Sequence, residues 1–297
     1  MSQNATTMPR RVKAAPASSN QDHSVHQVTP YQVICVIILV VLALLFTFPL
    51  YWIITGSFKG PQAVNAKVPV WFPMEPTLVN YQKLFEKPAL LWMYNTVFMC
   101  VAAMALTCIA AAMGGYALAK KRFTGRALIF TLFVCAMALP KQVILIPLLK
   151  EMAFLGLHNT LWAVILPTVG WPFGVFLMKQ FSEGIPTEML EAARIDGASE
   201  ARTFVKIVLP MVKPGIGALA IFTFINSWND YFMQLIMLSS TSNLTISLGI
   251  AKLQAENSTD FGLIMAGAAL AAVPIIIIFL IFQKYFTKGI AMGAVKG

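Results

Sequence analysis

Residues 185–200 read IPTEMLEAARIDGASE, a polar stretch between two long apolar runs, and the interpretation of the whole chain starts from it. Pro186 and Glu188 suit the first turn of a helix, where a missing N–H costs nothing and a negative charge meets the positive end of the helix dipole. Gly197 can adopt the left-handed conformation that ends a helix, and Ser199 can cap the next one. The stretch therefore predicts a short helix, a turn and a second helix.

Ala192 and Ala193 lie in the middle of the predicted short helix. Paired alanines allow a partner surface to approach closely, while Glu191 and Arg194 offer charged contacts at its edge. On physical grounds alone, an ordinary solvated amphipathic helix is an equal alternative.

Long apolar runs flank this stretch on both sides, and only 11% of the 297 residues are charged, against roughly 25% in an ordinary soluble domain. About 20 apolar residues in a helix cross the hydrocarbon layer of a bilayer. The sequence therefore predicts an all-α, polytopic membrane protein with six transmembrane helices. The expected spans are about 33–54, 90–119, 127–149, 161–178, 214–238 and 261–282.

The beginning of the chain differs from the rest. Residues 1–30 are polar and rich in Ser, Ala, Gln and Pro, so we interpret them as a disordered cytoplasmic tail that precedes a membrane domain of residues 31–297. A cleaved signal peptide is not expected, because the first apolar run is too long and no small-residue cleavage site follows it.

Basic residues concentrate on one side of the predicted spans, and this side is expected to be cytoplasmic. The net charge of +10 is therefore interpreted as a topology signal, with no nucleic-acid partner, because no basic face with a recognition motif is present. Six spans place both termini on the cytoplasmic side. The basic residues of that side are Arg10, Arg11, Lys13, Lys120, Lys121, Arg122, Arg126, Lys179, Arg194, Arg202, Lys206, Lys213, Lys284, Lys288 and Lys296.

The opposite side carries two loops, 56–89 and 239–260, whose Pro, Asn and Ser content suits water. Several spans are expected to be interrupted, at Gly114-Gly115, Pro140, Pro147, Pro167 and Pro172. Breaks are tolerated where neighbouring helices or a wet cavity satisfy the freed backbone groups, so the spans should pack around a pathway. Simple kinks without a functional role are the alternative at each proline.

A spaced pattern within residues 185–210 is similar at every position to the EAA loop of ABC importer permeases. It consists of Glu191-Ala192-Ala193, then Asp196-Gly197, then Ile207, and finally Leu209-Pro210. In that family the loop forms a cytoplasmic coupling helix that sits in a cleft of a separate nucleotide-binding subunit. The resemblance implies that these residues couple the chain to an ATPase.

The end of the chain resembles one branch of that family, the MalG-like permeases of carbohydrate importers. Residues 283–297, Trp228-Asn229-Asp230 and Ile146-Pro147-Leu148 carry this second resemblance. It implies that the tail 289–297 reaches the interface between the nucleotide-binding subunits, through its last residues, Gly293, Ala294, Val295, Lys296 and Gly297. A frayed terminus is the alternative.

The chain has no Gly-x-x-x-x-Gly-Lys-[Ser/Thr] phosphate loop, so it lacks the backbone cradle that holds ATP phosphates. We expect a transporter subunit that is not itself an enzyme and binds no cofactor. The resemblance implies a second homologous permease, two nucleotide-binding subunits that bind ATP and Mg²⁺, and an extracytoplasmic solute-binding protein. The expected location is the bacterial inner membrane.

The pathway for a carbohydrate should be polar, mostly uncharged and lined by aromatic rings. Asn226, Trp228, Asn229 and Asp230 form such a cluster in the fifth span, and Lys141 is an ionisable residue in the third. A structural role for Asp230 or Lys141, through a salt bridge or snorkelling, is the alternative. In maltose-type importers the partner permease holds the sugar, which implies that a MalG-like subunit mainly completes the cavity.

Two other functions are weighed against carbohydrate import. An ion-coupled secondary transporter predicts paired acidic residues at mid-membrane and two related halves, which the sequence does not show. An ABC permease for glycerol phosphates would place basic residues in the pathway, and Lys141 keeps that alternative open.

No metal site is predicted. Cys35, Cys100, Cys108 and Cys135 lie in apolar runs without paired spacing, so they are interpreted as small buried hydrophobic residues. The three histidines lie in the tail and in one short loop.

Overall fold

A computed structural model describes residues 29–256 and 259–294, with side chains to residue 281, and every regular element in these ranges is helical. The chain divides into two units, residues 1–48 and 49–297. The elements are α1 (Pro30–Ser57), α2 (Pro61–Val64), α3 (Val79–Phe85), α4 (Ala89–Lys120), α5 (Arg126–Met137), α6 (Lys141–Phe154), α7 (Trp162–Val169), α8 (Pro172–Glu183), α9 (Thr187–Ile195), α10 (Glu200–Thr203), a π-helical turn (Phe204–Val208), α11 (Leu209–Met211), α12 (Lys213–Asn229), α13 (Tyr231–Met237), a 3₁₀ turn (Thr241–Asn243), α14 (Ile246–Glu256) and α15 (Phe261–Ala294).

Four helical stretches in the described residues are long and apolar enough to cross a bilayer alone: α1, α4, the stretch formed by α7 and α8, and α15. Two bent pairs pass the same criterion together. One is α5 with α6, bent by 109°, and the other is the segment Glu200–Met211 with α12, bent by 75°. The protein is therefore an all-α, polytopic membrane protein, and the predicted six spans are reached when each bent pair counts as one.

The predicted third and fifth spans are not continuous helices. The third run breaks before Lys141, because Pro140 has an extended backbone and cannot donate a backbone hydrogen bond. The fifth run breaks at Asp230, whose carboxylate accepts a hydrogen bond from the Met233 N–H at 3.4 Å and so caps α13. The predicted break at Pro140 is therefore confirmed, whereas the break at Asp230 was not predicted.

The predicted break at Gly114-Gly115 is wrong, since α4 continues through both residues. A Cβ at Gly115 would lie 2.6 Å from the backbone of Met178 and Lys179, so this glycine permits α4 and α8 to approach closely. Pro147 and Pro167 lie inside α6 and α7, whereas Pro172 occupies the first turn of α8.

The predicted loop 239–260 contains an eleven-residue helix, α14. Side chains of α4 hold this region by hydrogen bonds: Thr96 Oγ1 accepts from the Ile246 N–H at 2.9 Å, and Asn95 Nδ2 donates to the Leu244 carbonyl at 2.9 Å. The loop 56–89 likewise contains α2 and α3. The hydrogen bonds between α4 and the 239–260 region join residues about 150 positions apart, so the local composition of that region did not reveal them.

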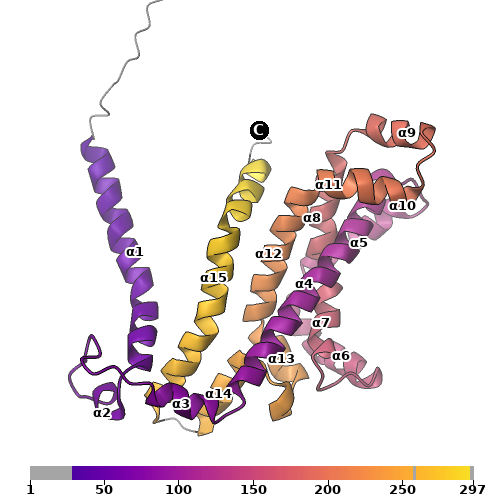
Figure 1. The fold of residues 1–297 in the computed structure, drawn as a ribbon. Coiled ribbons are helices and arrows are strands. Elements are labelled where there is room, and N and C mark those ends of the chain that lie inside the picture. The colour runs from indigo at the N-terminus through magenta and orange to yellow at the C-terminus, as the bar shows by residue number, and fades with distance from the viewer. Residues whose placement is uncertain (1–28, 257–258, 295–297) are drawn as a thin grey trace, which may run out of the picture. The chain divides into compact units, whose positions relative to one another are not determined.

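Within residues 49–281, α4 packs along α8 and α12, and α12 packs on α15 (Figure 1). Two apolar clusters form the core. One contains Trp92, Ile165 and Trp228, and the other contains Tyr116, Met178 and Leu190. The second cluster joins the short helix α9 to the ends of α4 and α8.

The predicted tail of residues 1–30 lies almost entirely outside the described residues, and α1 begins at Pro30. Of the four cysteines, Cys100 is buried, Cys35 and Cys108 are half-buried, and Cys135 is exposed. The expectation that all four are buried is therefore wrong for Cys135.

Candidate functional site

The predicted short helix is α9, and its local structure follows the sequence signals closely. Glu188 lies in the first turn, and Pro186 is the residue just before the helix rather than part of it. Gly197 has φ +73°, and the N–H of Ala198 donates to the Ala193 carbonyl at 2.9 Å, which closes the helix end. Ser199 accepts from the Arg202 N–H at 3.3 Å and caps α10.

The two faces of α9 have different environments. Leu190 and Ala193 are buried, and Leu190 belongs to the second apolar cluster. Met189, Ala192 and Ile195 face outward, and the Ile195 side chain is 87% exposed. The paired alanines therefore differ in exposure, since Ala193 is largely buried and Ala192 is exposed, although both line the hollow beside α9. An exposed apolar stripe on a polar segment indicates an interaction surface.

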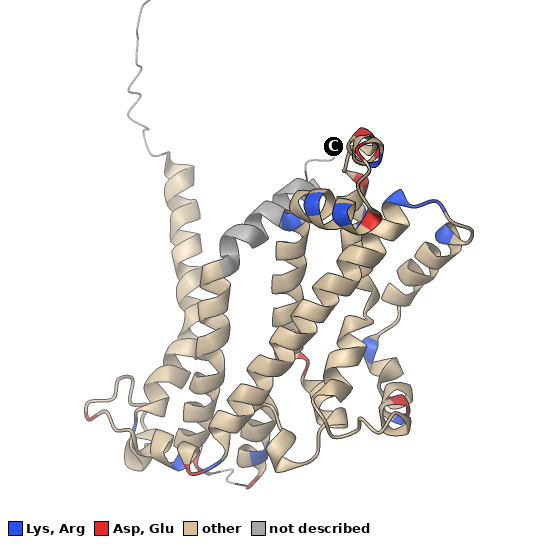
Figure 2. Ribbon diagram, turned by 45° about the vertical axis from the view of Figure 1, so that its right-hand side comes forward, with Lys and Arg blue, Asp and Glu red and all other residues tan. Residues whose placement is uncertain are grey.

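Two adjacent lysines at the end of α4 hold the segment on both sides of α9. Lys120 Nζ donates to the carbonyls of Glu183 at 3.1 Å and Ile185 at 2.6 Å, just before α9. Lys121 forms an ion pair with Glu200, just after α9. The two anchors therefore attach the segment around α9 to the last residue of α4 and to the residue just after it. Figure 2 shows charged positions at this end of the molecule and at the opposite end, with few along the helices between them.

Glu200 is the electrostatic centre of the second anchor. It accepts a hydrogen bond from Lys121 and another from Arg194 at 3.2 Å. The hydrogen bond from Lys121 holds the pKa of Glu200 below its usual 4.5; burial opposes it, and the charge of Lys121 and the hydrogen bond and charge of Arg194 add to the lowering. The sequence indicated Lys121 only as a topology signal, whereas Arg194 was expected to offer charged contacts at the edge of the helix.

The segment after α10 links the turn to α12. Ile207 and Leu209 are half-buried against the second cluster, and Pro210 is exposed in α11. A hollow of about 410 Å³ lies between α9 and this segment, with Ala192, Asp196 and Ile207 among its lining residues. Glu191 is exposed and does not line it. Of the predicted coupling residues, the structure places Ala192, Ala193, Asp196 and Ile207 around this hollow.

The last residues of the chain are only partly described. α15 extends to Ala294 and includes Gly293. The side chains beyond residue 281, and residues 295–297 with Val295, Lys296 and Gly297, lie outside the described residues.

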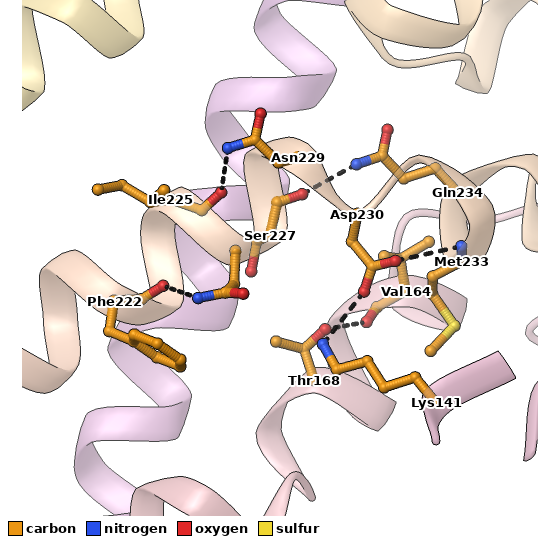
Figure 3. Close-up of polar contacts among 11 residues, drawn as sticks. Lys141, Val164, Thr168, Phe222, Ile225, Ser227, Asn229, Asp230, Met233 and Gln234 are labelled. Atoms are coloured by element: carbon orange, nitrogen blue, oxygen red, sulfur yellow. Dashed lines mark hydrogen bonds and ion pairs between the residues drawn. The ribbon is translucent and has the colours of Figure 1, made fainter.

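The predicted pathway residues separate into two groups. Lys141 Nζ lies 3.4 Å from Asp230 Oδ2 and 4.7 Å from the centre of the Trp171 ring. Figure 3 shows Asp230 between this lysine and the Met233 N–H. Two residues from the third and fifth predicted spans, 89 positions apart, therefore meet as an ion pair.

A cavity of about 280 Å³ lies beside this ion pair, and both Lys141 and Asn226 line it. Trp228 does not line the cavity. It is 4% exposed and packs against Phe224 in the first cluster, with ring centroids 5.7 Å apart. Asn229 donates to the Ile225 carbonyl at 2.9 Å and also lies outside the cavity lining (Figure 3). The Trp228 ring therefore belongs to the core and not to this cavity, and its role as a pathway residue stays a prediction.

Sequence reasoning missed Trp171, the aromatic residue that does line the cavity. It has an extended backbone directly before Pro172 at the break between α7 and α8. The combination of tryptophan and proline inside an apolar run was the available signal, because side chains at a helix break are free to face a cavity.

With this geometry established, comparison with known proteins identifies the family. Residues 103–292 match the family described as binding-protein-dependent transport system inner membrane component. The chain belongs to this family. It is therefore a permease, the membrane-spanning part of an ABC importer, and not its ATPase.

This permease is similar to several named transport proteins and to a solved structure. It is 35% identical to the arabinooligosaccharides transport system permease protein AraQ of Halalkalibacterium halodurans, over 86% of this chain and 93% of that protein. It is 30% identical to the diacetylchitobiose uptake system permease protein DasC of Streptomyces coelicolor, over 87% of this chain and 95% of that protein. A solved bacterial ABC transporter involved in import of the acidic polysaccharide alginate has a chain with the same fold, at a TM-score of 0.76 and 24% identity, covering 86% of this permease and 96% of that chain.

Proposed function

We propose that this permease imports a carbohydrate, an oligosaccharide, and that α9 receives the force of ATP hydrolysis from a separate subunit. The main support for this proposal is the exposed apolar face of α9, formed by Met189, Ala192 and Ile195. The segments before and after α9 are held by Lys120 and Lys121 at the end of α4. The names of the relatives support the cargo, since AraQ and DasC are named for oligosaccharide transport.

The proposed mechanism is a rigid-body motion. Closure of two nucleotide-binding subunits around ATP and Mg²⁺ displaces α9, and Lys120 and Lys121 carry the displacement into α4. Because α4 packs along α8 and α12, the spans that border the cavity move with it. Alternating access to the cavity follows from this movement.

The remaining subunits belong to the same proposal. A second homologous permease completes the pathway, and an extracytoplasmic solute-binding protein delivers the cargo. The chain lies in the inner membrane with α9 and both termini on the cytoplasmic side, as the distribution of basic residues favours. The tail 289–297 reaches the interface of the nucleotide-binding subunits.

Glycerol phosphate is a less well supported candidate for the cargo. Its support was the charge of Lys141, but that charge is paired with Asp230 at 3.4 Å and lies over the Trp171 ring. Membership of the ABC importer family sets aside an ion-coupled secondary transporter.

Substitution of Gly197 tests the coupling role. Gly197→Asp should abolish ATP hydrolysis coupled to transport in reconstituted vesicles, while the subunit remains in the membrane, because the φ of +73° and the docked partner both disfavour a side chain there. Gly125→Asp is the matched control, since Gly125 has φ +85° and equally open surroundings in the α4–α5 connection. Unchanged coupling in the Gly197 variant, or equal loss in both, would contradict the proposal.

A further inference from the structure

Three helix breaks of the permease converge on one point. Lys141 begins α6 after the break at Pro140, Trp171 lies at the break between α7 and α8, and Asp230 lies at the break between α12 and α13. Lys141 joins them, through the ion pair with Asp230 at 3.4 Å and a contact of 4.7 Å with the Trp171 ring. Broken membrane helices are where transporters commonly form substrate sites.

The cavity beside this point has an aromatic lining. Trp171, Phe173 and Phe222 contribute rings, and the two phenylalanine rings lie 4.5 Å apart at 39°. The volume of about 280 Å³ lies near the lower end of the roughly 300–1,000 Å³ that is typical of small-molecule sites. It suits one ring of a sugar chain rather than a whole oligosaccharide.

The cavity also has polar groups with spare hydrogen-bonding capacity. Thr107 is 3% exposed and lines the cavity, and no described residue bonds its Oγ1. Asn226 uses one N–H to donate to the Phe222 carbonyl at 2.8 Å, which leaves its carboxamide oxygen without a donor among the described residues. Asn226 is exposed and lines the cavity, so its oxygen can accept from a ligand hydroxyl, whereas the cost of a buried polar group without a partner applies to Thr107 alone.

The charge of the cavity indicates a neutral ligand. Lys141 is its only lining residue with a formal charge, and Asp230 compensates that charge from outside the lining. An anionic ligand would have to compete with the Asp230 carboxylate for the same ammonium group. A neutral sugar ring needs no such exchange, since its apolar face can stack on an aromatic ring while its hydroxyl groups meet amide and hydroxyl side chains.

We propose that this chain itself binds one ring of a neutral oligosaccharide during transport, with Trp171 as the stacking platform and Asn226 and Thr107 as hydrogen-bonding partners. The proposal rests on the function proposed above and deepens it, because it departs from the expectation that a MalG-like subunit only completes the cavity. Lys141 and Asp230 act as positioning residues that hold the three breaks together.

The experiment uses the complete importer with its solute-binding protein in vesicles. Uptake of arabinotriose, diacetylchitobiose, lactose and glycerol 3-phosphate by the unaltered importer first establishes the cargo. Import of none of the three sugars, or of glycerol 3-phosphate alone, overturns the inference at this step. The imported sugar is then the probe for the variants.

Trp171→Ala and Asn226→Ala should each lower sugar uptake about tenfold, the effect of one good contact. ATP hydrolysis stimulated by the loaded binding protein should persist, because the coupling end is untouched. Trp171→Phe should restore most of the uptake, since a ring remains. Thr107→Val, which keeps the shape and removes the hydroxyl, should lower uptake by a smaller factor.

The matched controls are Trp162→Ala and Asn229→Ala. Trp162 begins α7, in the same span as Trp171 but outside the cavity lining, and Asn229 makes the same type of bond as Asn226 on the same helix. Both controls should keep uptake and ATP hydrolysis. Unchanged uptake in the Trp171 and Asn226 variants, or parallel loss of uptake and ATP hydrolysis, overturns the inference. The Gly197 variant, measured in the same vesicles, reports separately on the proposed function.

Discussion

The coupling segment and the central cavity are built in opposite ways. Every predicted coupling residue lies within residues 185–210, and short-range signals shape the helix and turn there. The cavity takes Thr107, Lys141, Trp171 and Asn226 from α4, α6, the α7–α8 break and α12. The comparison teaches that a local motif can be recognised from sequence, whereas a pathway assembled from distant helices depends on how they pack.

The comparison is tested most strongly at the exposed face of α9. Ile195→Glu should lower coupled ATP hydrolysis by about tenfold or more while leaving the fold intact, because the Ile195 side chain is 87% exposed and should serve only the partner. Phe123→Glu, at a 43% exposed position between α4 and α5, is the control. Normal coupling in the Ile195 variant would show that this face does not dock.

The packing between distant helices is tested at two adjacent glycines of α4, Gly114 and Gly115. Gly115→Ala should destabilise the permease by about 1–3 kcal/mol, because its Cβ would lie 2.6 Å from the α8 backbone, which no rotamer change relieves. Gly114→Ala meets only Val175 methyl groups at 3.6 Å and should be neutral or slightly stabilising. Thermal unfolding of the purified importer measures both, and equal midpoints would refute the close approach of α4 and α8.

A loss of similar size is expected when the ion pair at the cavity is broken. Lys141→Met or Asp230→Asn alone should destabilise the permease by about 1–3 kcal/mol, since each leaves a half-buried partner without its ion pair. The double variant should recover part of that loss, which a double-mutant cycle on thermal unfolding measures. Strictly additive losses would mean that the two residues do not interact.

The smallest effect is expected at Glu200, which is an exposed anchor. Since its pKa lies below the usual 4.5, its stabilising contribution is present above pH 4.5 and is lost as the pH falls through the lowered value. The protection factors of the α9–α10 amides against hydrogen exchange, which correct for the slower intrinsic exchange at lower pH, should therefore fall on acidification. Glu200→Gln should abolish this extra response and cost less than about 1 kcal/mol. An unchanged response in that variant would assign it to another group.

The sequence by itself determined the class of the protein, its apolar runs and the structure of the coupling segment. Hydropathy shows whether a helix lies in lipid or in water, and capping signals act within a few residues. Both can therefore be recognised in the sequence without knowledge of the tertiary structure. The helix end at Gly197 and the cap at Ser199 were predicted for this reason.

Tertiary structure alone decided which side chains reach the cavity. Trp228 and Trp171 are both aromatic residues near a helix break, yet the first is buried in the core and the second lines the cavity. Local sequence patterns likewise did not predict that Lys141 pairs with Asp230 or that α8 packs closely against α4 at Gly115. The physical reason is that burial depends on which helices approach one another, and this is set by packing between segments far apart in the chain.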